Sequence, residues 1–131
     1  GKPELGNMRA FAYSDDGGQT WEEISLDDRL IEPICQASLI EGIPQCDRSL
    51  PPYVFSNPAS KNKRRNMTIR ISDGAPGNWR TSKTIYDGSA AYSSLAMLSK
   101  DRIGCLYERD NYGRITLALV DVDWLEAPES P

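Results

Sequence analysis

The chemistry open to this chain is set by the titratable side chains that it contains. Its 131 residues include no histidine, which excludes histidine-based triads, a histidine general base and histidine metal ligands within the chain. Titrating chemistry must therefore come from Asp, Glu, Tyr, Lys or Cys. The spacing of the three cysteines, Cys35, Cys46 and Cys105, fits no zinc or CxxC redox motif. Either Cys35 and Cys46 form a disulfide and Cys105 is free, or all three are buried thiols.

Composition narrows the class of protein. The length suits one ordinary domain, and 15 Lys and Arg against 19 Asp and Glu argue against a nucleic-acid partner. No apolar run approaches the roughly 20 residues of a membrane span, and no signal peptide is visible. The chain begins with Gly1 and enters a strand-like pattern almost at once. We interpret it as a cut piece of a longer protein or a processed chain.

The catalytic candidates must be positioned by short extended segments, because almost no helical period is present. We expect strands at 9–13, 21–26, 34–40, 53–55, 64–72, 79–86, 92–98, 103–107 and 115–122. A polar connection is expected at 27–29 and a turn at Asp87-Gly88. In 64–72, Met67, Ile69 and Ile71 should lie on one face and the polar residues on the other. The pattern predicts an all-β fold, either a sandwich or a propeller.

One corner stands out, Ser14-Asp15-Asp16-Gly17-Gly18-Gln19-Thr20-Trp21. Glycine accepts positive φ and aspartate can bond the backbone ahead of it, so a tight hairpin is expected. The aspartate carboxylate and the threonine hydroxyl should satisfy turn amides, and Trp21 should tuck under as an apolar plug. A generic β-turn is the alternative. The full pattern resembles the Asp-box of sialidase-like β-propellers, which joins the third and fourth strands of a blade and carries no catalytic residue.

A degenerate copy of the corner, from Ser72 to Trp79, keeps only the serine and the tryptophan at the same separation. Trp21 and Trp79 are 58 residues apart, a suitable length for one four-stranded blade. We therefore expect a partial propeller of four-stranded antiparallel blades. Counting strands gives about two to three blades over residues 1–131, with no second domain.

Further motifs follow one another along the chain and resemble the C-terminal portion of an exo-α-sialidase (neuraminidase) of the six-bladed propeller type. They are Asn7-Met8-Arg9, Ser56-Asn57-Pro58, Arg64-x-Asn66-Met67-Thr68, Ala91-Tyr92-Ser93-Ser94-Leu95 and Leu106-Tyr107-Glu108. Their order and spacing make the resemblance specific, and it covers nearly the whole chain.

The resemblance implies that Tyr92 is the nucleophile. Sialic acid carries a carboxylate on its anomeric carbon, which would repel a carboxylate nucleophile, whereas a phenol is neutral until activated. A tyrosine, with a reference pKa near 10, needs a base beside it. The family uses a glutamate about 16 residues before the second catalytic arginine, which falls before Gly1. Without the resemblance, Tyr92 reads as a buried strand aromatic with a bonded hydroxyl.

The same resemblance implies that two arginines grip the substrate carboxylate, because planar guanidinium groups suit that anion. Arg9 matches the second arginine of the family and Arg64 the third. Arg65 competes, but strand alternation puts it on the face of Met67, so we choose Arg64. Many relatives have a longer loop between Arg9 and the Asp-box, and solvated surface charges are the alternative for both arginines.

Glu108 matches a carboxylate that braces the first arginine of the family, a supporting role. That first arginine and the catalytic aspartic acid lie outside this chain. The resemblance implies a retaining exo-sialidase that releases terminal sialic acid from sialylated glycans through a tyrosyl-enzyme intermediate, with no metal or organic cofactor. It favours a secreted or cell-surface protein.

We expect the chain alone to lack the acid, the base and one arginine, and to need the rest of its propeller or a second copy. The alternative of a different class is a non-catalytic Asp-box propeller that binds carbohydrate or protein. A trans-sialidase, which transfers sialic acid instead of hydrolysing it, would share every motif in this chain.

Overall fold

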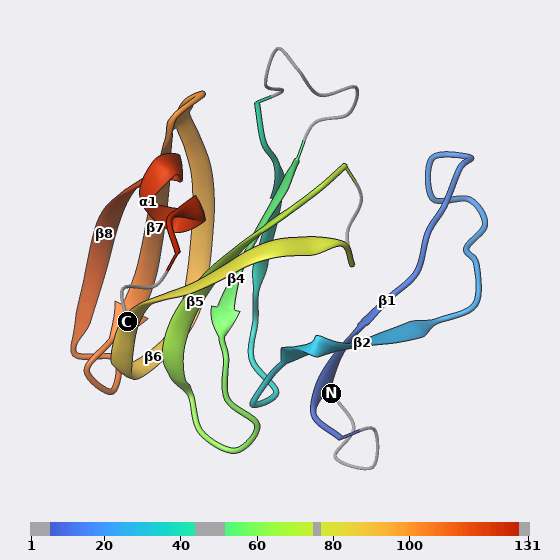
Figure 1. The fold of residues 1–131 in the computed structure, drawn as a ribbon. Coiled ribbons are helices and arrows are strands. Elements are labelled where there is room, and N and C mark those ends of the chain that lie inside the picture. Colours follow the sequence, from blue (N-terminus) through green and yellow to red (C-terminus); the bar gives the residue numbers. More distant parts are fainter. Residues whose placement is uncertain (1–5, 44–51, 75–76, 129–131) are drawn as a thin grey trace.

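The computed structural model describes residues 6–43, 52–74 and 77–128, which form an all-β fold with one short helix (Figure 1). This confirms the expected fold class. The elements are β1 (Met8–Phe11), β2 (Ser25–Ile31), β3 (Ser38–Glu41), β4 (Tyr53–Pro58), β5 (Arg65–Ser72), β6 (Trp79–Ser99), β7 (Arg102–Arg109), β8 (Arg114–Asp121) and α1 (Val122–Glu126).

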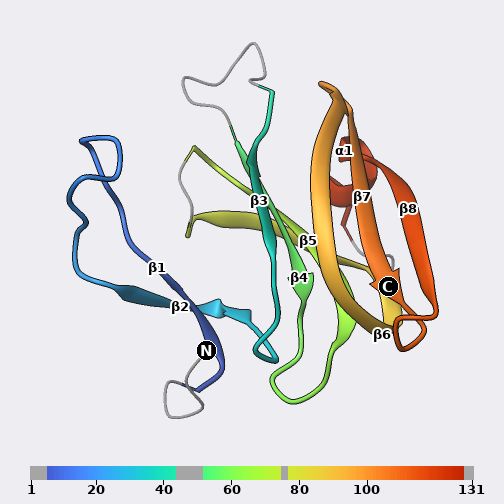
Figure 2. The same cartoon turned by 180° about the vertical axis from the view of Figure 1, so that it is seen from behind.

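The strands form two sheets, and every pair of neighbours is antiparallel. β1 and β2 make a two-stranded ribbon, and the other strands make a six-stranded sheet in the order β3-β4-β5-β6-β7-β8. Both views show the ribbon standing at one end of the molecule, beyond β3 and β4 (Figures 1 and 2). The neighbouring strands of the large sheet follow chain order, as expected where short turns connect them.

Strand β6 differs most from the expectation. It is one continuous strand of 21 residues, so the predicted turn at Asp87-Gly88 is wrong. Its first part pairs with β5 up to Ser89, and its second part pairs with β7 from Ala90. The strand curves strongly between these parts (yellow to orange in Figure 1) and so joins two sub-sheets. Local turn chemistry at an Asp-Gly pair was overridden because both sides of the pair find strand partners.

Three other strands have boundaries that moved by three or more residues. The strand expected at 53–55 continues to Pro58, because Ser56, Asn57 and Pro58 pair with β5. The strand expected at 21–26 begins only at Ser25 and runs through the predicted polar connection, because Asp27 and Leu30 are buried. The strand expected at 34–40 begins only at Ser38, because Ile34 has a positive φ of 56° that an extended strand does not allow. The irregular segment before Ser38 becomes important at the candidate site.

Strand β5 is the centre of the fold. As expected, Met67, Ile69 and Ile71 are fully buried on one face. The opposite, polar face is buried as well, through Arg70 and its neighbours on that face. The clean alternation therefore marks two different buried environments instead of one buried and one solvated face.

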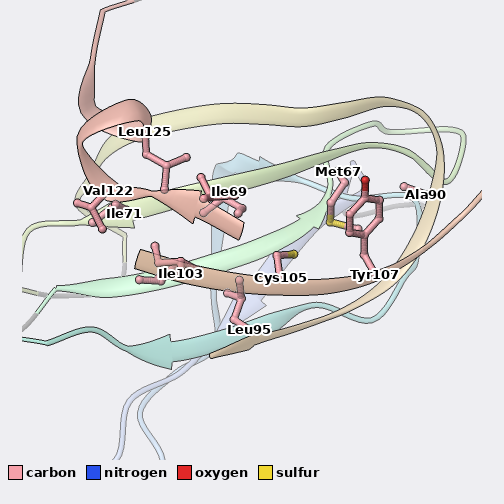
Figure 3. Close-up of a cluster of buried hydrophobic side chains, with 12 residues drawn as sticks. Met67, Ile69, Ile71, Ala90, Leu95, Ile103, Cys105, Tyr107, Val122 and Leu125 are labelled. Atoms are coloured by element: carbon pink, nitrogen blue, oxygen red, sulfur yellow. The ribbon is translucent and has the colours of Figure 1, made fainter. Parts of the chain in front are cut away.

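The apolar face of β5 packs into the main core (Figure 3). Residues of β4, β6, β7, β8 and α1 complete it: Val54, Ala90, Leu95, Ile103, Cys105, Tyr107, Val120, Val122 and Leu125. Helix α1, which the sequence did not predict, covers this core with Val122 and Leu125. No described helix has the length and apolar character to cross a membrane.

The corner between β1 and β2 is built as its residue types require, with one exception. The Asp16 carboxylate accepts hydrogen bonds from the backbone N–H groups of Gln19 and Thr20 and from the Thr20 hydroxyl. Trp21 is 64% exposed, so the predicted apolar plug is wrong. Its indole N–H instead donates to the Gly18 carbonyl over 3.1 Å. Because the corner projects from the ribbon away from the six-stranded sheet (Figure 1), the ring does not reach the main core.

The two described cysteines, Cys35 and Cys105, are buried free thiols, and Cys46 lies outside the described residues. Burial raises the pKa of the Cys35 thiol, and it raises the pKa of the Cys105 thiol to about 11. Of the two open alternatives, the structure thus has Cys35 as a thiol.

Candidate functional site

Arg64 and Tyr92 lie against each other, although 28 residues separate them in the sequence. The guanidinium carbon of Arg64 is 5.6 Å from the centre of the Tyr92 ring. Nη1 of Arg64 also donates to the Tyr112 hydroxyl over 2.9 Å. This bond raises the pKa of Arg64, so the group stays a cation. Arg65 turns elsewhere and donates to the Asp87 carbonyl.

Arg9 approaches the same region from the ribbon. Its Nη2 donates to the Cys35 carbonyl over 2.9 Å and forms an ion pair of 2.6 Å with Glu32. Glu32 is only 4% exposed, so this carboxylate is a buried counter-charge for Arg9. The guanidinium also lies 5.8 Å from the centre of the Phe55 ring. A carboxylate and a ring therefore hold Arg9 in one orientation.

The two arginines are tied to consecutive residues of one segment. Nη2 of Arg64 donates to the Ile34 carbonyl over 3.2 Å, next to the Cys35 carbonyl that Arg9 uses. In an extended strand, successive carbonyls point to opposite sides. The positive φ of Ile34 breaks that alternation, and such a conformation is rare for a β-branched residue. We call residues 34–36 the strap.

Tyr92 projects from β6 and its side chain is 49% exposed. Its backbone N–H donates to Oε2 of Glu108, on β7, over 3.2 Å. Tyr92 and Glu108 line a cavity of about 280 Å³ with Gln36, Ser93, Ser94, Leu106, Tyr107 and Ile115. The predicted nucleophile is thus accessible and borders a hollow with mostly apolar walls.

A buried polar network fastens the ribbon to the sheet behind Arg9. Asn57 donates to the Ile31 carbonyl of β2 and accepts a hydrogen bond of 2.9 Å from Nη1 of buried Arg70. Burial lowers the pKa of Arg70 to about 10. The Trp79 indole N–H donates to the Asp27 carboxylate over 2.7 Å. Asn57 of the Ser56-Asn57-Pro58 motif and Trp79 of the degenerate copy therefore both join the ribbon to the sheet.

The four predicted site residues differ in how directly they meet. Arg64 touches Tyr92, and Glu108 bonds to the Tyr92 backbone. Arg9 joins them through the strap.

Sequence reasoning missed three residues beside the site: Glu32, which pairs with Arg9, Tyr112, which bonds Arg64, and Gln36, which bonds the residue after Tyr92. A glutamate in an otherwise apolar run before Pro33 was an available signal for the first. No local pattern marks Tyr112, whose contact spans 48 residues.

The arrangement suits recognition of an anion beside a phenol. Arg9 and Arg64 keep N–H groups beyond those used inside the protein, because each guanidinium carries five donors. Among the described residues, no group of three or more Cys, Asp or Glu side chains is placed to hold a metal ion.

Comparison with known proteins gives consistent results. No family model matches the chain. Over 103 residues it is 35% identical to a sialidase of Micromonospora viridifaciens, covering 76% of this chain and 16% of that protein. Over 109 residues it is 37% identical to a sialidase of Bacteroides fragilis (strain YCH46), covering 79% of this chain and 20% of that protein.

Among solved structures, the chain is similar to the Hadza microbial sialidase Hz136, with a TM-score of 0.74 and 30% identity. The match covers 87% of this chain and 23% of that one. The chain thus spans about a fifth of the length of the relatives that it matches. Sialidase structures of this kind are β-propellers, and the described sheets correspond to part of such a propeller with antiparallel blades.

Proposed function

This chain belongs to the sialidase family and matches part of the length of each relative, and we propose that it forms part of a retaining exo-sialidase site. The complete site releases terminal sialic acid from glycoconjugates through a tyrosyl-enzyme intermediate. The observation that supports this best is the contact between Arg64 and Tyr92. It brings a carboxylate-binding cation beside an exposed phenol, as a substrate with a carboxylate on its reacting carbon requires.

In this proposal, Arg9 and Arg64 bind the sialic acid carboxylate. Guanidinium groups bind carboxylates through charge-assisted hydrogen bonds, which are stronger than neutral ones. Binding there places the anomeric carbon, to which the carboxylate is attached, close to Tyr92. The Ile34 and Cys35 carbonyls and the Tyr112 hydroxyl hold the two arginines before substrate arrives, so little reorganisation is needed.

Tyr92 then attacks the anomeric carbon through its phenol oxygen while the glycosidic C–O bond breaks. A base takes the phenol proton, and an acid protonates the departing oxygen. In the second step the deprotonated acid takes a proton from water, the water oxygen attacks the anomeric carbon, the tyrosyl–sugar bond breaks, and the protonated base returns its proton to the Tyr92 oxygen. Two inversions give net retention. The resemblance assigns the base and the acid to residues that this chain does not contain.

We also propose where the rest of the propeller packs. The outer face of β7 and β8 exposes apolar side chains, with Leu106 and Leu117 paired in register and Ile115 opposite Glu108. Exposed apolar patches of this kind are typical of interaction surfaces. Because Glu108 and Tyr92 border this face, blades that cover it would bring the first arginine and the acid to the site.

The test uses a chimera in which this chain replaces the matching portion of the Micromonospora viridifaciens sialidase, hereafter the chimeric sialidase. It is assayed with a fluorogenic sialoside beside its Tyr92→Phe variant and the isolated chain. We expect turnover by the chimeric sialidase, loss of at least about 1,000-fold in Tyr92→Phe, and none by the isolated chain.

The matched control is Tyr53→Phe on β4, outside the candidate site, which should retain full activity. A Tyr92→Phe chimera that kept full activity would refute the nucleophile. A folded but inactive chimera that still bound sialic acid would favour the non-catalytic binding propeller. Turnover by the isolated chain would show that the acid and the base lie within it.

A further inference from the structure

Tyr92 lies in a β-bulge. Ala90 pairs with Arg109 and Ser93 with Tyr107, so three steps along β6 correspond to two steps along β7. One extra residue is therefore inserted in β6 at Tyr92 or Ala91. A bulge interrupts the hydrogen bonds of the strand pair and redirects a side chain. The backbone at the bulge needs other partners, and the Glu108 carboxylate supplies one for the Tyr92 N–H.

Gln36 supplies partners for both backbone groups of the next residue, Ser93. Its Oε1 accepts a hydrogen bond from the Ser93 N–H over 2.9 Å, and its Nε2 donates to the Ser93 carbonyl over 3.0 Å. One carboxamide thus bonds both backbone groups of Ser93, as a residue of a neighbouring strand would. The second Nε2 hydrogen donates to the Ala37 carbonyl over 2.9 Å, which fixes the orientation of the amide.

The position of Gln36 in the strap links this contact to the arginines. The Ile34 and Cys35 carbonyls, immediately before it, accept from Arg64 and Arg9. Two residues after Gln36, the Ser38 hydroxyl accepts from the Leu95 N–H over 3.1 Å, repeating the contact one pleat further along β6. Four residues between Ile34 and Ser38 therefore bond Arg64, Arg9 of β1 and two residues of β6, all of which are distant in sequence.

We propose that Gln36 is a positioning residue for Tyr92. By holding both backbone groups of Ser93, it fixes the bulge that aims the phenol. Because it belongs to the strap, it also fixes the phenol relative to Arg9 and Arg64. The inference rests on the proposed role of Tyr92, but the contact with Ser93 can be tested without catalysis.

The first experiment measures amide hydrogen exchange in the chimeric sialidase, with Gln36→Ala against the unsubstituted chimera. The Ser93 amide should exchange at least about 10-fold faster in Gln36→Ala, while the Ile69 amide at the centre of β5 should not change. Gln19→Ala, at the exposed corner, is the matched control and should leave both amides unchanged. Unchanged exchange at Ser93 would overturn the proposal.

The second experiment measures kcat and KM in the chimeric sialidase. Gln36→Ala should lower kcat about 10- to 100-fold and leave KM within about 2-fold of the parent value. Arg9 and Arg64 still bind the substrate carboxylate, but the nucleophile is misplaced. Gln36→Glu keeps an acceptor for the Ser93 N–H but loses the donor, so its kcat should be intermediate. Gln19→Ala should match the parent chimera.

The two experiments separate this inference from the proposed function. Faster exchange at Ser93 together with a lower kcat and an unchanged KM supports the positioning role. Two outcomes would overturn the positioning role and leave Gln36 a structural residue. One is faster exchange with an unchanged kcat. The other is a lower kcat with a higher KM and a lower melting temperature. If the chimera with Gln36 unchanged folds but is inactive, the proposed function is refuted. The catalytic role of the Gln36–Ser93 contact is then refuted with it.

Discussion

The Tyr112 hydroxyl accepts a hydrogen bond of 2.9 Å from Nη1 of Arg64, which ties the β7–β8 turn to the start of β5. Asp110, Asn111 and Tyr112 all have positive φ, so the turn is held in an uncommon conformation where it presents this hydroxyl. The turn therefore helps to orient a predicted substrate-binding cation, and this relationship is open to a direct test.

Replacing Tyr112 by phenylalanine should weaken substrate binding modestly. The change removes one hydrogen bond from an exposed guanidinium, so we expect KM of the chimeric sialidase to rise about 3- to 10-fold while kcat changes little. Steady-state kinetics with the fluorogenic sialoside give both constants. Tyr53→Phe is the matched control, and equal KM values in the two variants would show that Tyr112 does not orient Arg64.

Replacing Arg64 by lysine should have a larger effect. Lysine keeps the charge but replaces the planar fork, whose two nitrogens bond Tyr112 and Ile34 separately, by a single nitrogen. We expect kcat/KM of the chimeric sialidase to fall about 10- to 100-fold, as expected for a lost charge-assisted hydrogen bond. Arg65→Lys is the control from the same basic run and should stay within about 3-fold. A larger loss in Arg65→Lys than in Arg64→Lys would reverse the assignment between these neighbours.

Replacing Asn57 by alanine should destabilise the fold strongly. It removes the acceptor of buried Arg70 and the donor to the Ile31 carbonyl, leaving a buried cation with one hydrogen bond fewer. We expect a loss of about 3 kcal/mol in the free energy of unfolding, measured by urea denaturation.

A double-mutant cycle with Arg70→Met tests the cause. If the Asn57–Arg70 bond matters, Asn57→Ala should cost much less in the Arg70→Met background than in the original chain. Additive losses would show that the two side chains act independently.

Acid should loosen the corner between β1 and β2. Hydrogen bonds from Thr20 and Ser14 lower the pKa of Asp16 to about 2, from 3.8. Because the folded pKa is the lower one, the stabilisation is complete above about pH 4 and is lost as the pH falls towards 2. The Thr20 amide resonance, followed by NMR, should titrate in that window. The Thr20 resonance should still titrate in the Asp15→Asn variant but not in the Asp16→Asn variant. Titration in both variants would assign the transition to another group.

The buried thiols should resist modification. In a Cys46→Ser background, Cys35 and Cys105 are the remaining cysteines. With the pKa of Cys105 at about 11, only about one thiol in 1,000 is ionised at pH 8, and burial also limits access.

Ellman's reagent should therefore react with neither thiol in the native chain at pH 8 and with both after unfolding in urea. Since the folded pKa of Cys105 exceeds the ordinary thiol pKa of 9.0, its contribution to stability should decline between about pH 9 and pH 11. Rapid native labelling of Cys105→Ser would identify Cys35 as accessible.

The sequence by itself determined the β class, the corner at Asp16 and the burial of Met67, Ile69 and Ile71. These features depend on local rules: glycine and aspartate chemistry in a turn, and the two-residue period of a strand. The same local rules misplaced the turn at Asp87-Gly88 and the indole of Trp21, because strand partners and available apolar surface are properties of the assembled chain.

The motifs also named Arg9, Arg64, Tyr92 and Glu108 before any geometry was known. Only the tertiary structure decided what surrounds them. The strap contacts of Ile34, Cys35 and Gln36 join residues that are 26 to 57 positions apart in the sequence. Such contacts depend on a β-bulge, a positive φ and the packing of the ribbon against the sheet, none of which leaves a periodic trace in the order of the residues.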